Sequence, residues 1–272
     1  MAILNSILCG VFDALLYPFR DLSPIVGLVI VSLITGVAML LVFKATSDQA
    51  GLAAVKRQIH AGIFEIRLFS DDPLAILRAQ AETLRHSARY MRLTLAPTLW
   101  MIVPLVLAII QLQHHYGYQG LEPRSIAIVK ARLEPGITVE PRLAIEAPPG
   151  LDVETEPLWI PSSNEANWRV RAQRPGDYEL LIHVNEAVFT KRVRASSSIV
   201  RRAPVRASAG VLDQLLYPAE PPIRGGPVQS ISVSYPDADV SLLGWETHWL
   251  VVFFILAMVF AFALRRPFRV TL

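Results

Sequence analysis

The chain has 272 residues, of which 53% are hydrophobic and 18% are charged, and its formal net charge is +3. This hydrophobic fraction is high for a soluble protein and indicates membrane-spanning segments. The small net charge, with no basic run interleaved with aromatic residues, argues against direct binding of nucleic acid, and the single cysteine excludes an intrachain disulfide.

Residues 1–22 predict an amphipathic helix that lies on the outer surface of a membrane. Aliphatic residues recur there on one side of a helix, and Asp13 interrupts the apolar stretch, so a cleavable signal peptide is not expected. Residues 23–44 follow as the first expected transmembrane helix, because 23–43 carries no charge and is long enough to span. Ser32 and Thr35 in this span either line a contact with another helix or are ordinary membrane composition.

Residues 45–94 predict a cytoplasmic helical hairpin. The turn Ser70-Asp71-Asp72-Pro73 supplies an N-cap carboxylate and a proline at the first helical position. Apolar residues on either side of this turn recur at helical spacing, and we expect the two series to bury each other in coiled-coil fashion. The first series is Leu52, Val55, Ile59, Ile63 and Ile66, and the second is Leu74, Leu77, Ala81, Leu84, Ala88, Met91 and Leu95. The basic residues left outside form either a binding face or a solvated face, and they are Arg57, Arg67, Arg78, Arg85 and Arg89.

Residues 95–115 predict the second transmembrane helix. Pro97 begins it and Pro104 lies within it, so a kink is expected. Gln111 and Gln113 lie at its outer end. The adjacent histidines at 114 and 115 are interpreted as interfacial polar residues, since no third metal ligand is in view.

Residues 116–206 predict an extracytoplasmic β-sandwich of the immunoglobulin-like kind. Short alternating segments are separated there by proline and glycine, and the clearest is a hairpin that turns at Asn185-Glu186 and opens with Tyr178. Trp159, Trp168 and Tyr178 are the expected core aromatics. Sandwiches of this kind bind partners more often than they catalyse.

Residues 207–246 predict a linker with one interfacial helix, and residues 247–272 predict the third transmembrane helix with a basic cytoplasmic tail. The segment 211–218 repeats 11–18 at six of eight positions, which indicates two similar interfacial helices or a chance resemblance. Ile231 to Tyr235 could add an edge strand. The positive-inside rule then places the hairpin and the C-terminus in the cytoplasm, and the N-terminus and residues 113–247 outside, in a bacterial inner membrane.

The sequence contains no motif that would support catalysis. GxSxG, HExxH, P-loop, dinucleotide-binding and CxxC patterns are all missing, and no charged residue lies inside the three apolar runs. We therefore expect a protein that is not an enzyme and that has no cofactor and no metal.

The order of these parts resembles the YidC-type membrane insertase superfamily, above all its short three-span archaeal members. The likeness is carried by Phe43-Lys44-Ala45-Thr46-Ser47-Asp48-Gln49, by the hairpin, and by Leu95-Ala96-Pro97-Thr98-Leu99 with Pro104. It covers about a quarter of the chain. An arginine that bacterial members place in their groove has no counterpart here, and the outer β-domain is an addition to the family plan.

The resemblance implies a factor that helps membrane proteins to insert or assemble without a cofactor. Ser32, Thr35, Gln111 and Gln113 would then be polar groups of a groove or interface, and the hairpin arginines would receive partners. The implied partners are membrane lipids and other membrane proteins as clients or complex partners, with a ribosome or translocon as a further class. The alternative is a non-catalytic structural subunit of a larger membrane complex, whose β-domain packs on the outer face of its partner.

Overall fold

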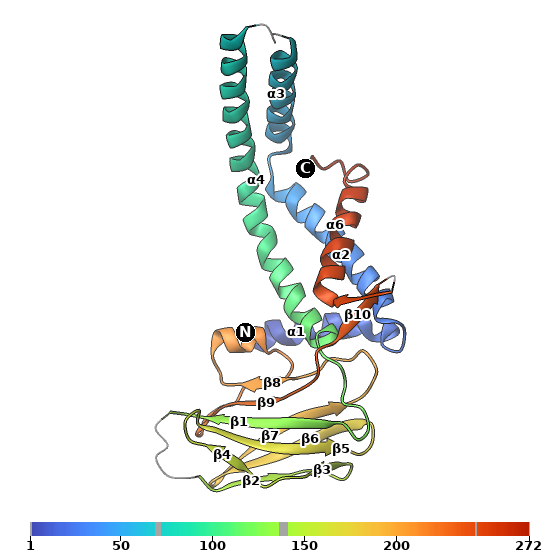
Figure 1. Cartoon of the computed structure of the whole chain (residues 1–272), viewed down its shortest axis with the longest axis vertical. Helices are drawn as coiled ribbons and strands as arrows, with labels where there is room; N and C mark the ends of the chain where they lie inside the picture. The colour runs from blue at the N-terminus through green and yellow to red at the C-terminus, as the bar shows by residue number, and fades with distance from the viewer. Residues whose placement is uncertain (1, 69–71, 136–140, 243, 272) are drawn as a thin grey trace. The chain divides into compact units, whose positions relative to one another are not determined.

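The structure is a computed structural model that describes residues 2–68, 72–135, 141–242 and 244–271. Its internal contacts divide the chain into two units. The β unit comprises residues 1–28 and 109–252, and the helical unit comprises residues 29–108 and 253–272. The described part contains long helices and a separate all-β region of antiparallel sheets (Figure 1).

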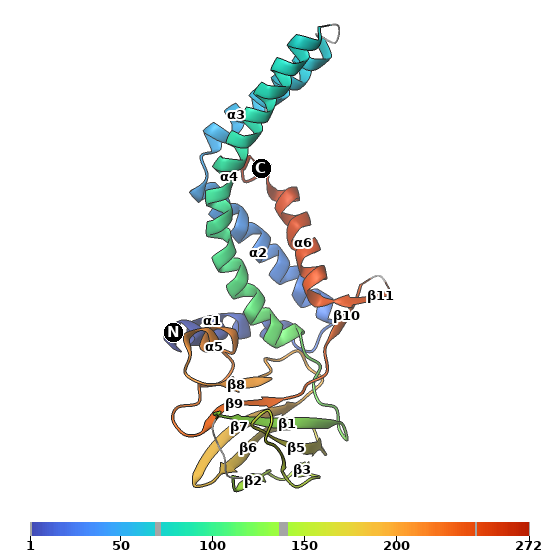
Figure 2. The same ribbon diagram turned by 60° about the vertical axis from the view of Figure 1, so that its left-hand side comes forward.

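Four helices supply the helical unit. They are α2 (Pro24–Thr46), α3 (Gln49–Leu68), α4 (Pro73–Tyr116) and α6 (Trp249–Leu264). α2 and α4 are each long and apolar enough to cross a membrane, whereas α6, with 16 residues, is shorter. The expected second arm of the hairpin and the expected second span are one continuous helix, α4. Its axis changes direction along its length in Figure 2, and Pro97 and Pro104 inside the helix account for such a bend.

The N-terminal end of α4 has the predicted cap. The backbone N–H of Leu74 donates to Asp72 Oδ1 over 2.9 Å, and Pro73 occupies the first helical position, where it needs no hydrogen-bond acceptor. The other two residues of the predicted turn, Ser70 and Asp71, lie outside the described residues. The helix therefore begins where the sequence indicated.

The hairpin arms, α3 and the first half of α4, lie side by side (Figures 1 and 2), but α4 does not use the predicted face. Ala79 is only 2% exposed and lies opposite α3, close to Gly62, where a side chain would collide with Thr83. Leu84, by contrast, is 71% exposed. The predicted burial of the second apolar series was therefore wrong: small residues bring the two backbones together, and the larger side chains remain outside. We call these exposed residues the leucine stripe, and they are Leu74, Leu77, Leu84, Met91 and Leu95.

α2 and α6 pack through small residues. A Cβ atom on Gly36 would lie 3.0 Å from the carbonyl oxygen of Ala257, so glycine lets these helices approach closely. Ser32 is fully buried, and its hydroxyl donates to the carbonyl oxygen of Phe253 over 3.4 Å. At the other end of α2, Lys44 donates to the carbonyl of Phe268 over 2.9 Å. These contacts fix the C-terminal segment against α2.

The β unit contains a six-stranded and a three-stranded antiparallel sheet. The first has the order β3-β5-β1-β9-β8, with β4 also paired to β5, and the second has the order β2-β6-β7. The strands of the first sheet are β1 (Ile126–Leu133), β3 (Leu151–Val153), β4 (Leu158–Ile160), β5 (Glu165–Ala172), β8 (Val205–Ala207) and β9 (Val228–Val233). Those of the second are β2 (Leu143–Glu146), β6 (Gly176–Val184) and β7 (Ala187–Ala195).

The β-domain extends beyond residue 206, where the sequence analysis ended it. β9 lies beyond residue 206 and pairs with β1 on one side and β8 on the other, so it is an inner strand rather than an edge strand. The alternating segment 136–145 also predicts a strand. Residues 136–140 lie outside the described residues, and the strand β2 begins at Leu143. The predicted hairpin is confirmed as β6–β7, with Asn185 at the turn in the left-handed region (φ 56°).

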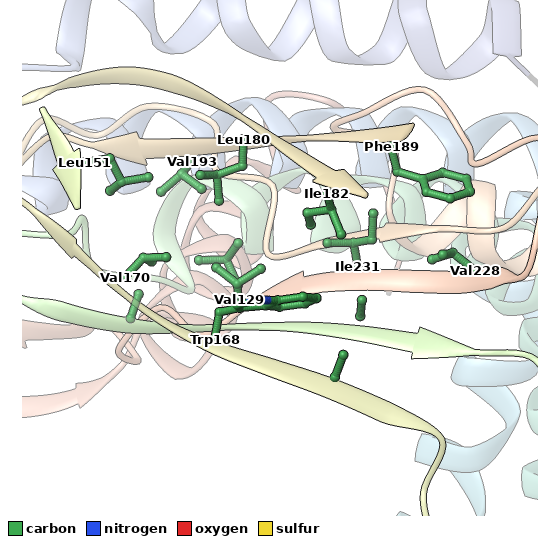
Figure 3. Close-up of a cluster of buried hydrophobic side chains, with 14 of the residues drawn as sticks. Val129, Leu151, Trp168, Val170, Leu180, Ile182, Phe189, Val193, Val228 and Ile231 are labelled. Atoms are coloured by element: carbon green, nitrogen blue, oxygen red, sulfur yellow. The ribbon is translucent and has the colours of Figure 1, made fainter. Parts of the chain in front are cut away.

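One hydrophobic core joins the two sheets. Trp168 is its largest fully buried side chain, and Figure 3 shows it beside Val129 in the layer between the sheets. Of the other predicted core aromatics, Trp159 and Tyr178 are only partly buried and pack against this cluster. The hydroxyl of Tyr178 donates to the carbonyl of Arg174 over 2.7 Å, which holds the start of β6.

Two short helices and a further hairpin complete the β unit. They are α1 (Ala2–Leu16), which continues into the 3-10 turn Tyr17–Phe19, α5 (Val211–Leu216), and the strands β10 (Asp239–Leu242) and β11 (Trp245–His248). The helix predicted near the N-terminus is present as α1, in which Asn5 is buried while Ile3 is 79% exposed. Asn5 Nδ2 donates to the carbonyl of Gln214 over 2.5 Å, so α1 and α5 are in contact.

Candidate functional site

A polar cluster within the β unit is the best-connected candidate site. Arg201 is its centre: its guanidinium donates to Asp13 Oδ1 (2.9 Å), to Gln111 Oε1 (2.7 Å) and to the carbonyl of Cys9 (3.2 Å). His115 lies 3.0 Å from the same oxygen of Asp13 and 3.0 Å from the carbonyl of Gln111. The side chain of Arg201 is only 9% exposed, so these partners hold a nearly buried charge.

The cluster keeps the Asp13 carboxylate ionised. Partial burial alone would raise the pKa of Asp13, but the hydrogen bond with His115 and the charge of Arg201 outweigh it and lower that pKa below its ordinary value. A carboxyl group with a lowered pKa stabilises the fold above about pH 4 and loses this contribution as the pH falls. Asp13 is half exposed, so solvent screening makes this contribution small.

Cys9 is not suited to nucleophilic chemistry. Burial raises the pKa of its thiol, and its sulfur lies 3.6 Å from Gln111 Oε1 and 3.6 Å from the carbonyl oxygen of Pro218. A reactive cysteine needs a lowered pKa and an adjacent base or cation aimed at the sulfur. The thiol therefore acts as a small packing group.

A pocket of about 820 Å³ opens beside the cluster, between α1, α5 and the strands β6 and β7. Its volume lies in the range of small-molecule sites. Charged side chains of both signs line it, and they include Asp13, Asp177, Glu179, Arg192, Arg194, Arg201, Asp213, Glu220 and Arg224. A second pocket, of about 340 Å³, shares Asp13, Arg201, Asp177 and Arg194 with it.

Most charges around the larger pocket are paired within the protein. Arg194 forms a two-point ion pair with Asp177 at 2.5 and 2.8 Å. Lys191 is fully buried and pairs with Glu220, whose other carboxylate oxygen accepts the backbone N–H of Arg192 over 2.7 Å. Burial lowers the pKa of Lys191, opposed by the charge of Glu220. Of this buried pair, Glu220 lines the pocket.

The four predicted polar site residues do not form one site, because each contacts different protein groups. In the β unit, Gln111 joins the Arg201 cluster, and Gln113 Oε1 accepts the indole N–H of Trp249 over 3.2 Å. In the helical unit, Ser32 and Thr35 are buried in α2. All four predicted residues therefore lie against protein neighbours.

The five predicted hairpin arginines are all exposed, and they are Arg57, Arg67, Arg78, Arg85 and Arg89. Three of them lie on α4, the helix that carries the leucine stripe. The hairpin therefore presents both apolar and basic side chains.

No group of three or more metal-binding side chains occurs among the described residues. The two adjacent histidines are buried: His114 Nδ1 lies 2.8 Å from the carbonyl of Ile110, and His115 belongs to the Arg201 cluster. They are structural groups of the β unit.

Sequence reasoning missed Arg201 and the pairing of Asp13 with His115. One signal pointed there: the repeated segment places Asp13 and Asp213 at equivalent positions, and both line the larger pocket.

Comparisons of the chain with protein-family models, with curated proteins and with solved structures give no match. Inferences about function therefore rest on the geometry and on the sequence.

Replacing Arg201 by glutamine should loosen the contact of α1 with the rest of the β unit. The variant loses the ion pair to Asp13 and the hydrogen bond to the carbonyl of Cys9. Hydrogen bonds to charged groups contribute about 1.5–3 kcal/mol, so a maleimide should label Cys9 roughly fivefold faster or more. Cys9 is the only cysteine, which makes the readout unambiguous.

The matched control for this labelling is Arg132→Gln, which removes an exposed ion pair to Glu165 elsewhere in the β unit. Equal labelling rates for the wild type and the Arg201 variant would mean that the cluster does not hold α1.

Proposed function

We propose that the protein is an integral membrane protein that binds another membrane protein as a non-catalytic assembly partner or subunit. In this proposal α2, residues 95–115 of α4 and α6 are the three spans. The hairpin is cytoplasmic, and the all-β region is extracytoplasmic and immunoglobulin-like. Two long apolar helices and the distribution of basic residues support this placement.

One observation favours a protein that binds a partner over one that offers client proteins a hydrated groove. Ser32, Thr35 and Gln111 are buried against protein neighbours, and Gln113 is hydrogen-bonded to Trp249. Polar groups of a hydrated groove would instead face open space. The apolar side chains that remain available point outward, and they include the leucine stripe and its continuation at Leu99, Trp100 and Val103.

The outward apolar surface of α4 suits a protein partner. Only 11% of the most apolar 18-residue stretch of this helix is buried within the chain. In the part of α4 proposed to be in the membrane, lipid would cover such a surface at no cost. In the hairpin the same kind of surface would face water, and exposed apolar patches of this kind mark interaction sites. The hairpin arginines would add electrostatic attraction to an acidic partner.

Insertase activity of the YidC kind is the second candidate, favoured by the same exposed stripe, which could receive apolar segments of client proteins. The clients would be nascent membrane proteins, delivered by a ribosome or a translocon, with lipids as the surrounding solvent. This activity would require water to enter the spans beside Ser32 and Thr35, so it would need a second arrangement of α2 and α6.

The two candidates differ in the stoichiometry of what they bind. The native protein, extracted in a gentle detergent and affinity-purified, should recover one defined membrane protein in a constant molar ratio near one, measured by quantitative mass spectrometry. Recovery of many nascent membrane proteins, ribosomes or translocon components in small molar ratios would instead support insertion and reject the subunit proposal.

A further inference from the structure

We propose that the 820 Å³ pocket of the β unit binds the headgroup of a phospholipid that carries a phosphate and a primary ammonium group. This inference rests on the proposed function in one respect, because it needs α1 and α5 to lie at the outer membrane surface.

The pocket lies behind two helices whose other sides are apolar. On α1, Asn5 and Cys9 line the pocket, while Ile3 and Ile7 are exposed. On α5, Gln214 lines the pocket, and its exposed aliphatic residues are Val211, Leu212 and Leu216. Helices with this division of faces lie in the membrane interface with the apolar side toward the acyl chains. The pocket then lies at the depth of the lipid headgroups.

The free charges of the pocket have both signs. Asp13, Asp177 and Glu220 are neutralised by Arg201, Arg194 and Lys191. Among the described residues, the guanidinium groups of Arg192 and Arg224 and the carboxylates of Glu179 and Asp213 have no ion-pair partner, although Asp213 accepts a hydrogen bond from the hydroxyl of Ser208. Glu179 and Arg192 lie directly opposite each other on β6 and β7, so unlike charges stand side by side on one strand pair. A zwitterion with a phosphate and an ammonium group is complementary to this pattern.

The unpaired carboxylates of the pocket favour a primary ammonium group. Glu179 lies on β6, lines the pocket and is exposed, so its carboxylate oxygens can accept hydrogen bonds from a ligand. Hydrogen bonds between an ammonium N–H and a carboxylate are charge-assisted and are stronger than neutral ones. The N–H groups of a primary ammonium can donate to Glu179, whereas the quaternary ammonium of choline has no N–H to donate.

The test is native mass spectrometry of the purified, delipidated full-length protein with three added phospholipids of identical acyl chains. These are phosphatidylethanolamine, phosphatidylcholine and phosphatidylglycerol. We expect the protein to retain phosphatidylethanolamine at least about fivefold more than the other two lipids, because it alone offers both a phosphate and N–H donors. Equal retention of all three, or preference for the anionic phosphatidylglycerol, would overturn the proposal.

The variant that tests the site is Arg192→Gln combined with Arg224→Gln, which removes the two free guanidinium groups. It should lower retention of phosphatidylethanolamine by at least about fivefold, since two charge-assisted contacts to the phosphate are lost. The control is Arg132→Gln, an exposed arginine of β1 that does not line the pocket, and it should retain the lipid as the wild type does. Retention by the double variant at the wild-type level would overturn the proposal.

One further measurement distinguishes a lipid from a water-soluble molecule with the same headgroup. Glycerophosphoethanolamine, which lacks acyl chains, should bind at least about tenfold more weakly than the lipid, because the apolar faces of α1 and α5 then contribute nothing. Equal binding of the two would overturn a lipid as the occupant. Lipid retention is measured without a protein partner, and partner recovery is measured without added lipid. Failure of either proposal is therefore seen separately.

Discussion

Replacing Lys191 by methionine is expected to lower the free energy of unfolding of the β unit by about 3–5 kcal/mol, the usual result of leaving one member of a buried ion pair alone. Lys191 is fully buried, and its ammonium group contacts Glu220 and the carbonyl oxygen of Ala203. In the variant, the Glu220 carboxylate would keep only the backbone N–H of Arg192. The unfolding midpoint of the β unit, followed by tryptophan fluorescence, should fall by about 6–20 °C.

The double variant Lys191→Met with Glu220→Gln provides the control. It removes both charges but keeps an amide oxygen that can accept the N–H of Arg192. Replacing a whole buried ion pair by neutral groups is often close to neutral, so the double variant should recover most of the lost stability. A double variant no more stable than Lys191→Met would show that lost packing, rather than an unpaired carboxylate, is the cause.

Local chemistry was sufficient to predict several elements. The β6–β7 hairpin could be predicted because Asn185 tolerates the left-handed conformation that its turn requires. The start of α4 was readable because Asp72 and Pro73 are a cap and a first-turn residue. The burial of Trp168 followed from its place in an alternating segment. Each of these signals lies within a few residues of the element that it defines.

Features that depend on distant partners were not predictable. Helical spacing showed that Leu77 and Leu84 share a face, but it could not show which face α3 would contact. That choice is made by Gly62 and Ala79, which allow the closer approach of the two backbones. Likewise, the ion pair between Asp13 and Arg201 joins residues 188 positions apart, and no local pattern links them.

The leucine stripe leads to the second large expected effect, the loss of the proposed partner. Leu77→Glu combined with Leu84→Glu should lower partner recovery by at least about tenfold. Each leucine side chain buried in an interface contributes about 1.5–3 kcal/mol, and about 1.4 kcal/mol corresponds to a factor of ten in affinity. Both leucines are exposed in the structure, so the fold of the hairpin should be unaffected.

Gln58→Glu combined with Ala61→Glu is the matched control, because it adds two negative charges at exposed hairpin positions on α3, away from the stripe on α4. If only charge mattered, both double variants would lose the partner equally, through weaker attraction to the hairpin arginines. If apolar contact dominates, as we expect, the control variant keeps the partner and the leucine variant loses it. Unchanged recovery with the leucine variant would remove the stripe from the interface and leave the spans and the β unit as the surfaces that bind the partner.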